Sequence, residues 1–356
     1  MSASIEPVLV SLRMGRPPPK ESRSEMPTSG PLVDRYGRIH TDLRISITDR
    51  CNFRCTYCLP EEGVAFLARS EILSIEEIHQ VAEAAHALGV ISVRITGGEP
   101  LIRRDVVDVV AGISAVGFED VALTTNGTDL VRLAPRLAEV GLQRVNISCD
   151  SLRANRFAAI RRRGRLQSVL EAMDAAEAAR LTPVKVNVVL VRGVNDDEIL
   201  DFARFGRDTG RIVRFIEFMP LDGEGSWRRD EVVSGAEVLA TIAREFPLKA
   251  SDDFGDPAPA TRFAFADGRG EIGVISSVTE PFCGTCDRLR LTAEGAVRNC
   301  LFSDDELSVR EVLRSGGGID ELALVLRRAV WGKLPGHGIN DPGFLRPRRS
   351  MSMIGG

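Results

Sequence analysis

Three cysteines lie within eight residues near the start of the chain, and their spacing suits an iron–sulfur cluster. They are Cys51, Cys55 and Cys58, in the pattern C-x3-C-x2-C. Cysteine thiolates hold such clusters, commonly one for each iron. Three thiolates without an evident fourth predict an open iron that can bind a small molecule, as a catalytic zinc keeps one position free. A structural zinc site is the alternative, but such sites favour paired C-x2-C units.

A second cysteine group follows more than 200 residues later, again with three members. Cys283, Cys286 and Cys300 predict a second cluster with an open iron; a three-cysteine zinc site and unliganded thiols are the alternatives. Arg288 and Arg290 stand between these cysteines, two apart in an expected strand, so both side chains point the same way. Paired arginines suit a phosphate or triphosphate, although a solvated strand face would carry them too.

The segment Gly97-Gly98-Glu99-Pro100 directly follows an expected strand. Two glycines let the backbone approach a ligand closely, and backbone carbonyls there can accept from an ammonium group. The same four residues could also form an ordinary turn between a strand and a helix. Their occurrence together with the cysteine group favours the ligand-binding interpretation.

Three basic residues interrupt otherwise apolar strand sequences: Arg44, Arg94 and Lys185. A buried cation is costly unless it is paired. Each residue could instead be an edge charge or face outward. Their shared position near one end of three strands favours a common polyanionic substrate. Cys149 has no neighbouring cysteine and is expected to be a packed thiol.

The composition is that of a globular protein with reduced thiols. The chain has 356 residues, a net charge of -4 and seven cysteines. The charge gives no whole-chain footprint for nucleic acid, and the cysteines are too sparse for a disulfide scaffold. No apolar run approaches the length of a membrane span, and the N-terminus lacks a convincing signal peptide. We therefore expect a cytoplasmic protein without a membrane segment.

Short β-branched runs alternate with alanine-rich helical stretches and predict a parallel sheet with right-handed crossovers. The expected strands are residues 43–47, 91–96, 121–125, 144–149, 184–191 and 212–218. A doubly wound sheet and an incomplete barrel both fit this rhythm, and both bind ligands at the carboxyl ends of their strands. Cys51, Gly98, Thr125, Ser148 and Met219 all fall at such ends.

Helix starts are visible in several places. Ser74 with Glu77 and Ser234 with Glu237 form capping boxes, and Asn195 is expected to cap a helix at 196–208. The rhythm breaks after residue 222, where we expect short strands at 261–265 and 271–275 and a helical region at 304–330. We divide the chain into a disordered extension (1–31), a catalytic α/β region (32–222), a C-terminal region (223–345) and a flexible Gly-Gly tail (346–356).

Together these motifs resemble the GTP 3′,8-cyclases, radical S-adenosylmethionine (SAM) enzymes of the first step of molybdenum cofactor biosynthesis. The C-x3-C-x2-C group marks the radical SAM superfamily, whose open iron chelates SAM. The second cysteine group with its two arginines, and the terminal Gly355-Gly356, mark the narrower family. The resemblance covers residues 31–356.

The resemblance implies an incomplete (β/α)6 barrel with a smaller C-terminal region and two [4Fe-4S] clusters, one on each cysteine group. It implies conversion of GTP to (8S)-3′,8-cyclo-7,8-dihydroguanosine 5′-triphosphate. The implied SAM contacts are Tyr57, Gly98, Ser148 and Met219, and the implied GTP contacts are Arg44, Arg94, Thr125, Lys185, Arg288 and Arg290. The Gly-Gly tail would reach into the active site.

The resemblance also implies a flavodoxin or ferredoxin as electron donor, a cyclic pyranopterin monophosphate synthase downstream, and a homodimer. Two other classes compete with this reading. A peptide-modifying radical SAM enzyme would usually carry more C-terminal cysteines. A double-glycine carrier or a zinc-based interaction protein would not need the first cysteine group.

Overall fold

The strands of this protein form one continuous sheet that curls into an open barrel. The computed structural model describes residues 17–251 and 258–355. Six parallel strands follow one another in chain order, namely β1 (Asp42–Ser46), β2 (Ser92–Thr96), β3 (Asp120–Thr125), β4 (Arg144–Ser148), β5 (Lys185–Leu190) and β6 (Ile212–Glu217). All six strands predicted from the sequence are confirmed, with ends that differ by at most one residue.

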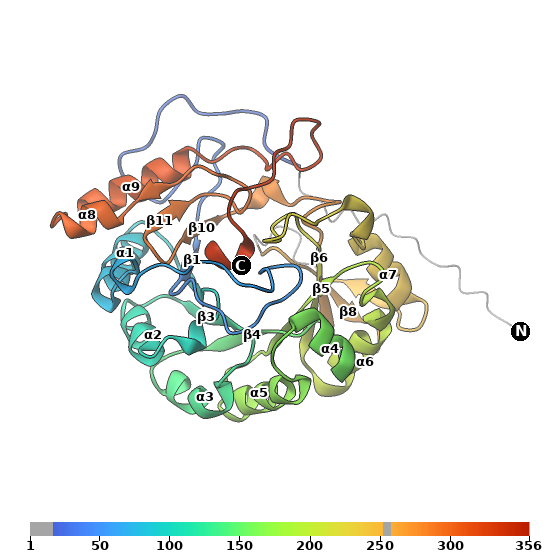
Figure 1. The fold of residues 1–356 in the computed structure, drawn as a ribbon. Coiled ribbons are helices and arrows are strands. Elements are labelled where there is room, and N and C mark those ends of the chain that lie inside the picture. Colours follow the sequence, from blue (N-terminus) through green and yellow to red (C-terminus); the bar gives the residue numbers. More distant parts are fainter. Residues whose placement is uncertain (1–16, 252–257, 356) are drawn as a thin grey trace, which may run out of the picture.

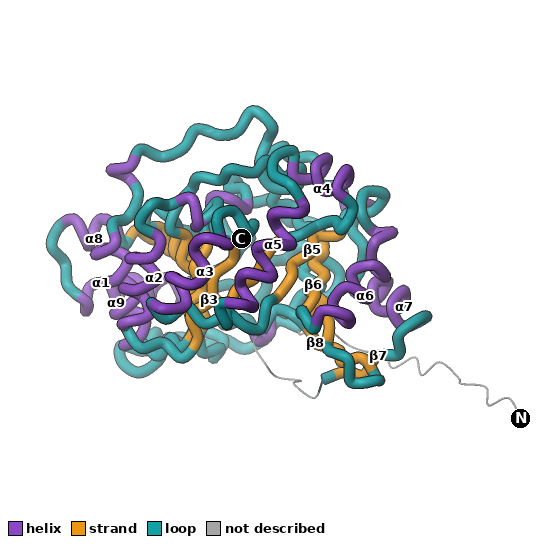
Figure 2. The backbone as a smooth tube through the Cα atoms, turned by 90° about the horizontal axis from the view of Figure 1, so that it is seen from below, coloured by secondary structure: helices purple, strands orange, loops and turns teal. Residues whose placement is uncertain are grey.

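Helices cover the outside of this sheet (Figure 1). They are α1 (Ile75–Ala87), α2 (Val106–Ala115), α3 (Leu130–Glu139), α4 (Ala154–Arg161), α5 (Leu166–Ala178), α6 (Ile199–Thr209) and α7 (Gly235–Ala243). The view from below shows helices α1, α2, α3 and α5 in front of the strands (Figure 2). Helices on the outer face alone distinguish a partial barrel from a doubly wound sheet, which carries them on both faces.

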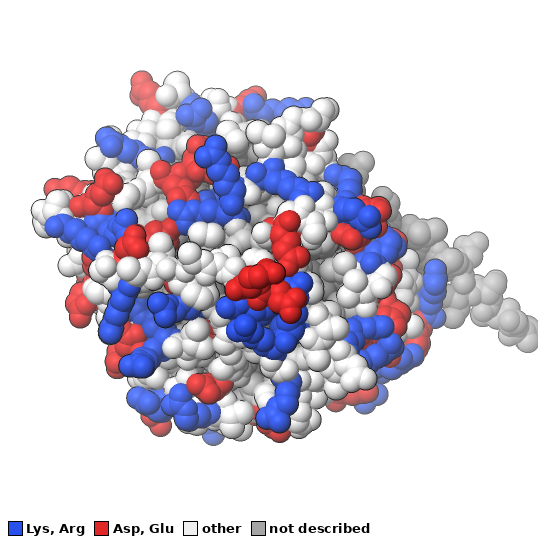
Figure 3. Space-filling view, in the orientation of Figure 1, with Lys and Arg blue, Asp and Glu red and all other residues white. Residues whose placement is uncertain are grey.

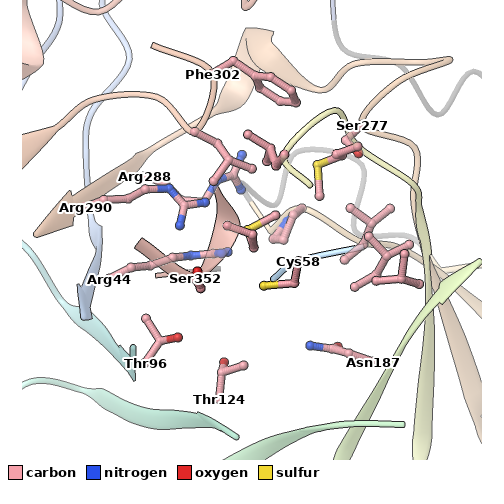
Figure 4. A pocket seen from close by; sticks show the side chains of 18 of the residues that line it. Arg44, Cys58, Thr96, Thr124, Asn187, Ser277, Arg288, Arg290, Phe302 and Ser352 are labelled. Carbon is pink, nitrogen blue, oxygen red and sulfur yellow. The ribbon is translucent and has the colours of Figure 1, made fainter. Parts of the chain in front are cut away.

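The two faces of the strands differ in polarity because successive side chains point to opposite sides. Leu43, Ile45, Val93 and Ile95 are fully or almost fully buried and belong to the main hydrophobic core, together with apolar residues of the helices. The residue between Leu43 and Ile45 is Arg44, which points into the barrel (Figure 4). The apolar outer face therefore holds the fold together, and the polar inner face is left to line a cavity.

Residues beyond 222 extend the same sheet at both edges. On one side, β9 (Glu271–Ile275) pairs parallel to β6, followed by β8 (Thr261–Phe265) and β7 (Leu248–Ala250). On the other side, β10 (Arg288–Leu291) pairs parallel to β1, followed by β11 (Ala296–Arg298) and β12 (Leu307–Ser308). Because one sheet contains strands from both parts of the chain, the boundary near residue 222 stays a prediction.

The capping boxes are confirmed at α1 and α7, where the side chains of Ser74 and Ser234 accept from the third helical backbone N–H. The cap at Asn195 is wrong. Its side-chain oxygen instead accepts from the N–H of Val191 at 2.8 Å. Its amide nitrogen donates to the carbonyls of Asp150 and Val189, at 2.8 and 2.9 Å, so the side chain ties the loops after β4 and β5 together. A short 3-10 turn, Asp196–Glu198, leads into α6.

The helical region predicted at 304–330 is wrong for its first part. Strand β12 comes first, and two helices follow, α8 (Arg310–Arg314) and α9 (Ile319–Trp331). Three consecutive glycines, at 316–318, separate them, because glycine is unfavourable inside a helix. Helix α9 then packs against α1.

Both ends of the described chain lie against the barrel. The carbonyls of Gly30 and Pro31 accept hydrogen bonds from Arg327. At the other end, the turn Met351–Met353 enters the centre of the ring (Figure 1). The predicted disordered extension falls partly on residues 1–16, which lie outside the described residues. Among the described residues, no helix has the length and apolarity to cross a membrane.

Surface charges are largely interspersed by sign. Figure 3 shows Lys and Arg mixed with Asp and Glu over the face of the barrel opening. Exposed pairs such as Arg153–Asp197 and Arg204–Glu245 contribute little stability individually. The interior of the barrel differs, because its cations greatly outnumber its carboxylates.

Candidate active site

One cavity of about 320 Å³ occupies the interior of the barrel, and both cysteine groups open into it. Its wall includes all six of these cysteines: Cys51, Cys55, Cys58, Cys283, Cys286 and Cys300. None of them forms a disulfide. Two groups separated by more than 200 residues therefore serve one site.

The first triad, Cys51, Cys55 and Cys58, lies on the loop after β1. The N–H of Cys58 donates to the carbonyl of Cys55 at 2.9 Å, and the N–H of Phe53 donates to the Cys51 sulfur at 3.4 Å. Burial raises the pKa of all three thiols, that of Cys51 to about 12. Three cysteines on one loop, none in a disulfide, fit an iron–sulfur cluster, because such clusters are held by cysteine ligands.

The second triad, Cys283, Cys286 and Cys300, has a more positive environment. Burial raises the pKa of Cys283 to about 11. Burial also raises that of Cys286, but the nearby cations of Arg288 and Lys333 outweigh it and bring the pKa down to about 6. The Lys333 ammonium donates to the Cys286 sulfur at 3.3 Å and to the Arg288 carbonyl at 2.8 Å.

The turn at Gly97-Gly98-Glu99-Pro100 packs directly on the segment that leads into the first triad. The N–H of Gly98 donates to the carbonyl of Thr48, and that of Glu99 to the carbonyl of Arg50. A Cβ atom at Gly98 would lie 2.3 Å from the Arg50 carbonyl oxygen. Only glycine permits this approach, so the turn and the cysteine loop are fixed relative to each other.

The buried carboxyl group of Glu99 fixes the start of the loop after β3 by hydrogen bonds. Its carboxyl group accepts from the N–H of Leu101, the Thr125 hydroxyl and the N–H of Asn126. Burial raises the pKa of Glu99 to about 7 against these hydrogen bonds. Thr125, predicted to contact GTP, therefore lies in the cavity wall with its hydroxyl already bonded to Glu99.

The four residues predicted to contact SAM all line the cavity: Tyr57, Gly98, Ser148 and Met219. The Tyr57 hydroxyl donates to Asp150 at 2.7 Å, which sets the ring beside the first triad.

Three arginines form a row on adjacent strands. Arg44 on β1 is paired in register with Arg94 on β2 and with Arg290 on β10. Figure 4 shows Arg44, Arg288 and Arg290 reaching into the same space. Burial and the neighbouring cations lower the pKa of Arg44 well below its usual range and that of Arg290 to about 10. Such a row suits an anion with several charges.

Lys185 has a different position from the other predicted GTP contacts. It begins β5, two residues before Asn187, which does line the cavity, whereas Lys185 is not part of the lining. Burial, followed by the charges of Arg214, Arg144 and Arg94, lowers its pKa to about 7. Lys185 therefore lies at the amino-terminal end of β5, outside the cavity wall.

Sequence reasoning missed four buried cations that line the cavity: Arg38, Arg161, Arg214 and Lys333. Arg214 donates to the side-chain oxygens of Asn187 and Asn146, at 3.0 and 2.7 Å. Its signal was present in the sequence, because it interrupts the apolar strand 212–218 as Arg94 interrupts 91–96.

Residues 351–355, the last described residues of the chain, enter the cavity. The Gly355 carbonyl accepts from Arg290 at 2.6 Å, and Met351 and Ser352 line the wall. Ile354 is fully buried. These residues cover the interior next to the first triad.

Comparisons with known proteins agree with this site. The Radical SAM superfamily profile matches residues 45–206, and the Molybdenum Cofactor Synthesis C profile matches residues 211–339. The fold resembles that of SuiB from Streptococcus suis bound to S-adenosylmethionine (TM-score 0.55, 12% identity, 80% of this chain and 64% of that chain). It also resembles anSMEcpe with bound AdoMet (TM-score 0.54, 14% identity, 84% and 82%). The protein is thus a radical SAM enzyme by class, which implies a four-iron cluster and SAM.

Curated relatives narrow the class. A GTP 3′,8-cyclase of Corynebacterium glutamicum is 46% identical over 336 residues, covering 91% of this chain and 89% of the relative. One from Mycobacterium sp. (strain KMS) is 47% identical over 345 residues, covering 96% and 99%. One from Streptomyces coelicolor is 47% identical over 329 residues, covering 91% and 96%. The chain belongs to the GTP 3′,8-cyclase family, and the predicted fold class and resemblance are confirmed.

Replacing Gly98 by alanine tests the contact between the turn and the cysteine loop. The added Cβ cannot coexist with the Arg50 carbonyl, so the turn must move away from the first triad. We expect SAM affinity of the iron-loaded protein to fall about tenfold or more, measured by equilibrium dialysis with the iron content determined in parallel. Gly343→Ala, where a Cβ meets nothing within 4 Å, is the control. Parental affinity in Gly98→Ala would contradict the assignment.

The thiols of the second triad offer a pH test in iron-free protein. Cys286 should alkylate faster than Cys283 near neutral pH, because the thiolate is the nucleophile and its pKa is about 6 rather than about 11. Lys333→Gln should move the midpoint of the Cys286 labelling profile to higher pH, as followed by mass spectrometry of the labelled peptides. The exposed Lys249→Gln serves as control. An unchanged profile in Lys333→Gln would remove Lys333 from this role.

Proposed function

We propose that this chain is a GTP 3′,8-cyclase, which converts GTP to (8S)-3′,8-cyclo-7,8-dihydroguanosine 5′-triphosphate in the first step of molybdenum cofactor biosynthesis. One observation carries the proposal. Two cysteine triads open into one cavity, and a row of arginines lies on the strands around them. The relatives that are 46–47% identical are named for this reaction.

Cys283, Cys286 and Cys300 hold a second [4Fe-4S] cluster in this proposal. The lowered pKa of Cys286 supports it, because a metal ligand must be deprotonated. With three protein ligands, one iron remains open to the substrate. A zinc site is the competing occupant, and metal analysis separates the two.

The arginine row holds the triphosphate in this proposal. Arg44, Arg94 and Arg290 of the row and the adjacent Arg288 supply the charge. Arg214 on β6 adds a cation that the sequence analysis missed. Thr125 and Lys185 complete the predicted contacts, Lys185 from the first residue of β5. Tyr57, Gly98, Ser148 and Met219 hold SAM beside the first triad.

Positioning is the main contribution of the protein to this reaction. When bound, the first cluster and SAM supply the radical that removes a hydrogen atom from the ribose of GTP. The arginines fix the triphosphate and thereby aim the ribose, which converts an encounter into an oriented reaction. The buried segment 351–355 keeps water from the interior.

The remaining partners belong to the same proposal. A flavodoxin or ferredoxin donates electrons, a cyclic pyranopterin monophosphate synthase takes the product, and the enzyme works in the cytoplasm as a homodimer. The support for these partners is the family alone.

The direct test is anaerobic incubation of the iron-loaded protein with GTP, SAM and dithionite. We expect both 5′-deoxyadenosine and a cyclised nucleotide by mass spectrometry, and roughly eight irons per chain for two four-iron clusters. Zinc in place of iron, or neither product with full iron content, would reject the proposal.

Single substitutions in the arginine row test substrate binding. Arg288→Ala and Arg44→Ala each remove a charge-assisted contact, commonly about 1.5–3 kcal/mol, so GTP affinity should fall about tenfold or more. We expect SAM cleavage to continue without cyclisation. Arg288 also lowers the pKa of Cys286, so iron content is measured in both variants. Arg328→Ala, exposed on α9, is the control, and unchanged GTP affinity would exclude the substituted arginine from the site.

A further inference from the structure

A buried arginine contacts the middle cysteine of the first triad. Arg161 is the last residue of α4, and its side chain is 3% exposed. Its Nη1 donates to the Cys55 sulfur at 3.2 Å. Its Nη2 forms an ion pair with the Asp150 carboxylate at 2.7 Å. The guanidinium therefore bridges a cluster ligand and a buried anion.

Backbone contacts hold Arg161 in this position. The last carbonyls of a helix have no partners within it, and here two of them bind the cysteine loop. The Arg161 carbonyl accepts from the N–H of Arg54 at 3.2 Å, and the Ile160 carbonyl accepts from the N–H of Thr56 at 3.0 Å. The end of α4 and the loop of the first triad thus form one unit.

Aromatic rings and the cavity surround the guanidinium. The rings of Phe53, Tyr57 and Phe157 lie 6.0, 5.8 and 5.9 Å from its central carbon. The Nε of Arg161 has no hydrogen-bond partner among the described residues, although the residue lines the cavity. A guanidinium stays protonated in proteins, and here it is also paired with the buried Asp150 carboxylate at 2.7 Å. Arg161 is therefore a fixed positive charge.

A fixed cation beside a thiolate ligand changes the energy of reducing the cluster. Reduction adds one electron and therefore one negative charge to the cluster. A nearby positive charge and an N–H···S hydrogen bond stabilise that added charge, and both raise the reduction potential. The Asp150 carboxylate acts in the opposite sense, because it partly neutralises the cation.

We propose that Arg161 is a positioning residue that sets the reduction potential of the first cluster through Cys55, with Asp150 as the opposing charge. Arg161 makes the cluster easier to reduce, and Asp150 limits this effect. The proposal rests on the cluster that the radical SAM class implies and does not depend on GTP as substrate. A redox measurement without GTP therefore distinguishes its failure from failure of the proposed function.

The test is a redox titration of the first cluster, followed by electron paramagnetic resonance. The full-length chain carries Cys283→Ala, Cys286→Ala and Cys300→Ala, so that only the first triad can hold a cluster. Arg161→Gln should shift the midpoint potential to more negative values, and Arg161→Lys, which keeps the charge, should shift it less. Arg163→Gln removes an exposed charge from the same run of arginines and should leave the potential unchanged.

Asp150→Asn should shift the midpoint potential in the opposite direction and is a second, independent test of the proposal. Without the opposing carboxylate, the midpoint potential should become more positive, a pattern that a merely structural role would not produce. The proposal is overturned if Arg161→Gln binds iron fully at the parental potential. If Arg161→Gln binds no iron, the other two variants decide: a parental potential in both Arg161→Lys and Asp150→Asn overturns the proposal.

Discussion

Excess positive charge on the inner face of the barrel is the constraint on which the site depends. In-register pairing places Arg44 beside Arg94 and Arg290, and Asp42 lies against the row, 4.0 Å from Arg94. Buried cations are costly unless they are paired. The apolar outer face, packed under the helices, provides the stability that lets the strands carry them. An anionic occupant is what makes this interior favourable, and thiolate-held clusters and a triphosphate are occupants of the right sign.

The two cysteine triads share one cavity but not one electrostatic environment. At the first triad, the charge of Arg161 is offset by Asp150 at 2.7 Å, and the thiols keep raised pKa values. At the second, Arg288 and Lys333 together bring the pKa of Cys286 to about 6. In both triads the middle cysteine accepts from a buried cation, through Arg161 or through Lys333. The larger positive charge lies at the second triad, where Arg288 and Lys333 both act on Cys286.

Local patterns in the sequence were sufficient for the six parallel barrel strands and the two cysteine groups, but not for their arrangement in space or for the short strands β7, β11 and β12. The alternation of 43–47 or 212–218 is the same in a doubly wound sheet and in a barrel, and only the placement of the helices separates them. Arg161 begins the run Arg161-Arg162-Arg163, which has the composition of an exposed basic segment. Its burial depends on how α4 docks on the cysteine loop, a contact with Cys55 across 106 positions of the chain. Asn195 fails as a helix cap because the N–H of Val191 occupies its side-chain oxygen, while the distant carbonyl of Asp150 binds its amide nitrogen.

Segment 351–355 lines the cavity and also contacts the arginine row. The carbonyl of Gly355 accepts from Arg290, so one cation of the row is bonded to the backbone when this segment is in place. Gly355 has a positive φ of 70°, and a Cβ there would lie 2.8 Å from the Thr96 side chain. Both the backbone conformation and the lack of space therefore require glycine. A carbonyl dipole offsets only part of a guanidinium charge, and the rest of the row keeps its excess. The segment therefore closes the interior next to the first triad while leaving most of the positive charge available to an anionic ligand.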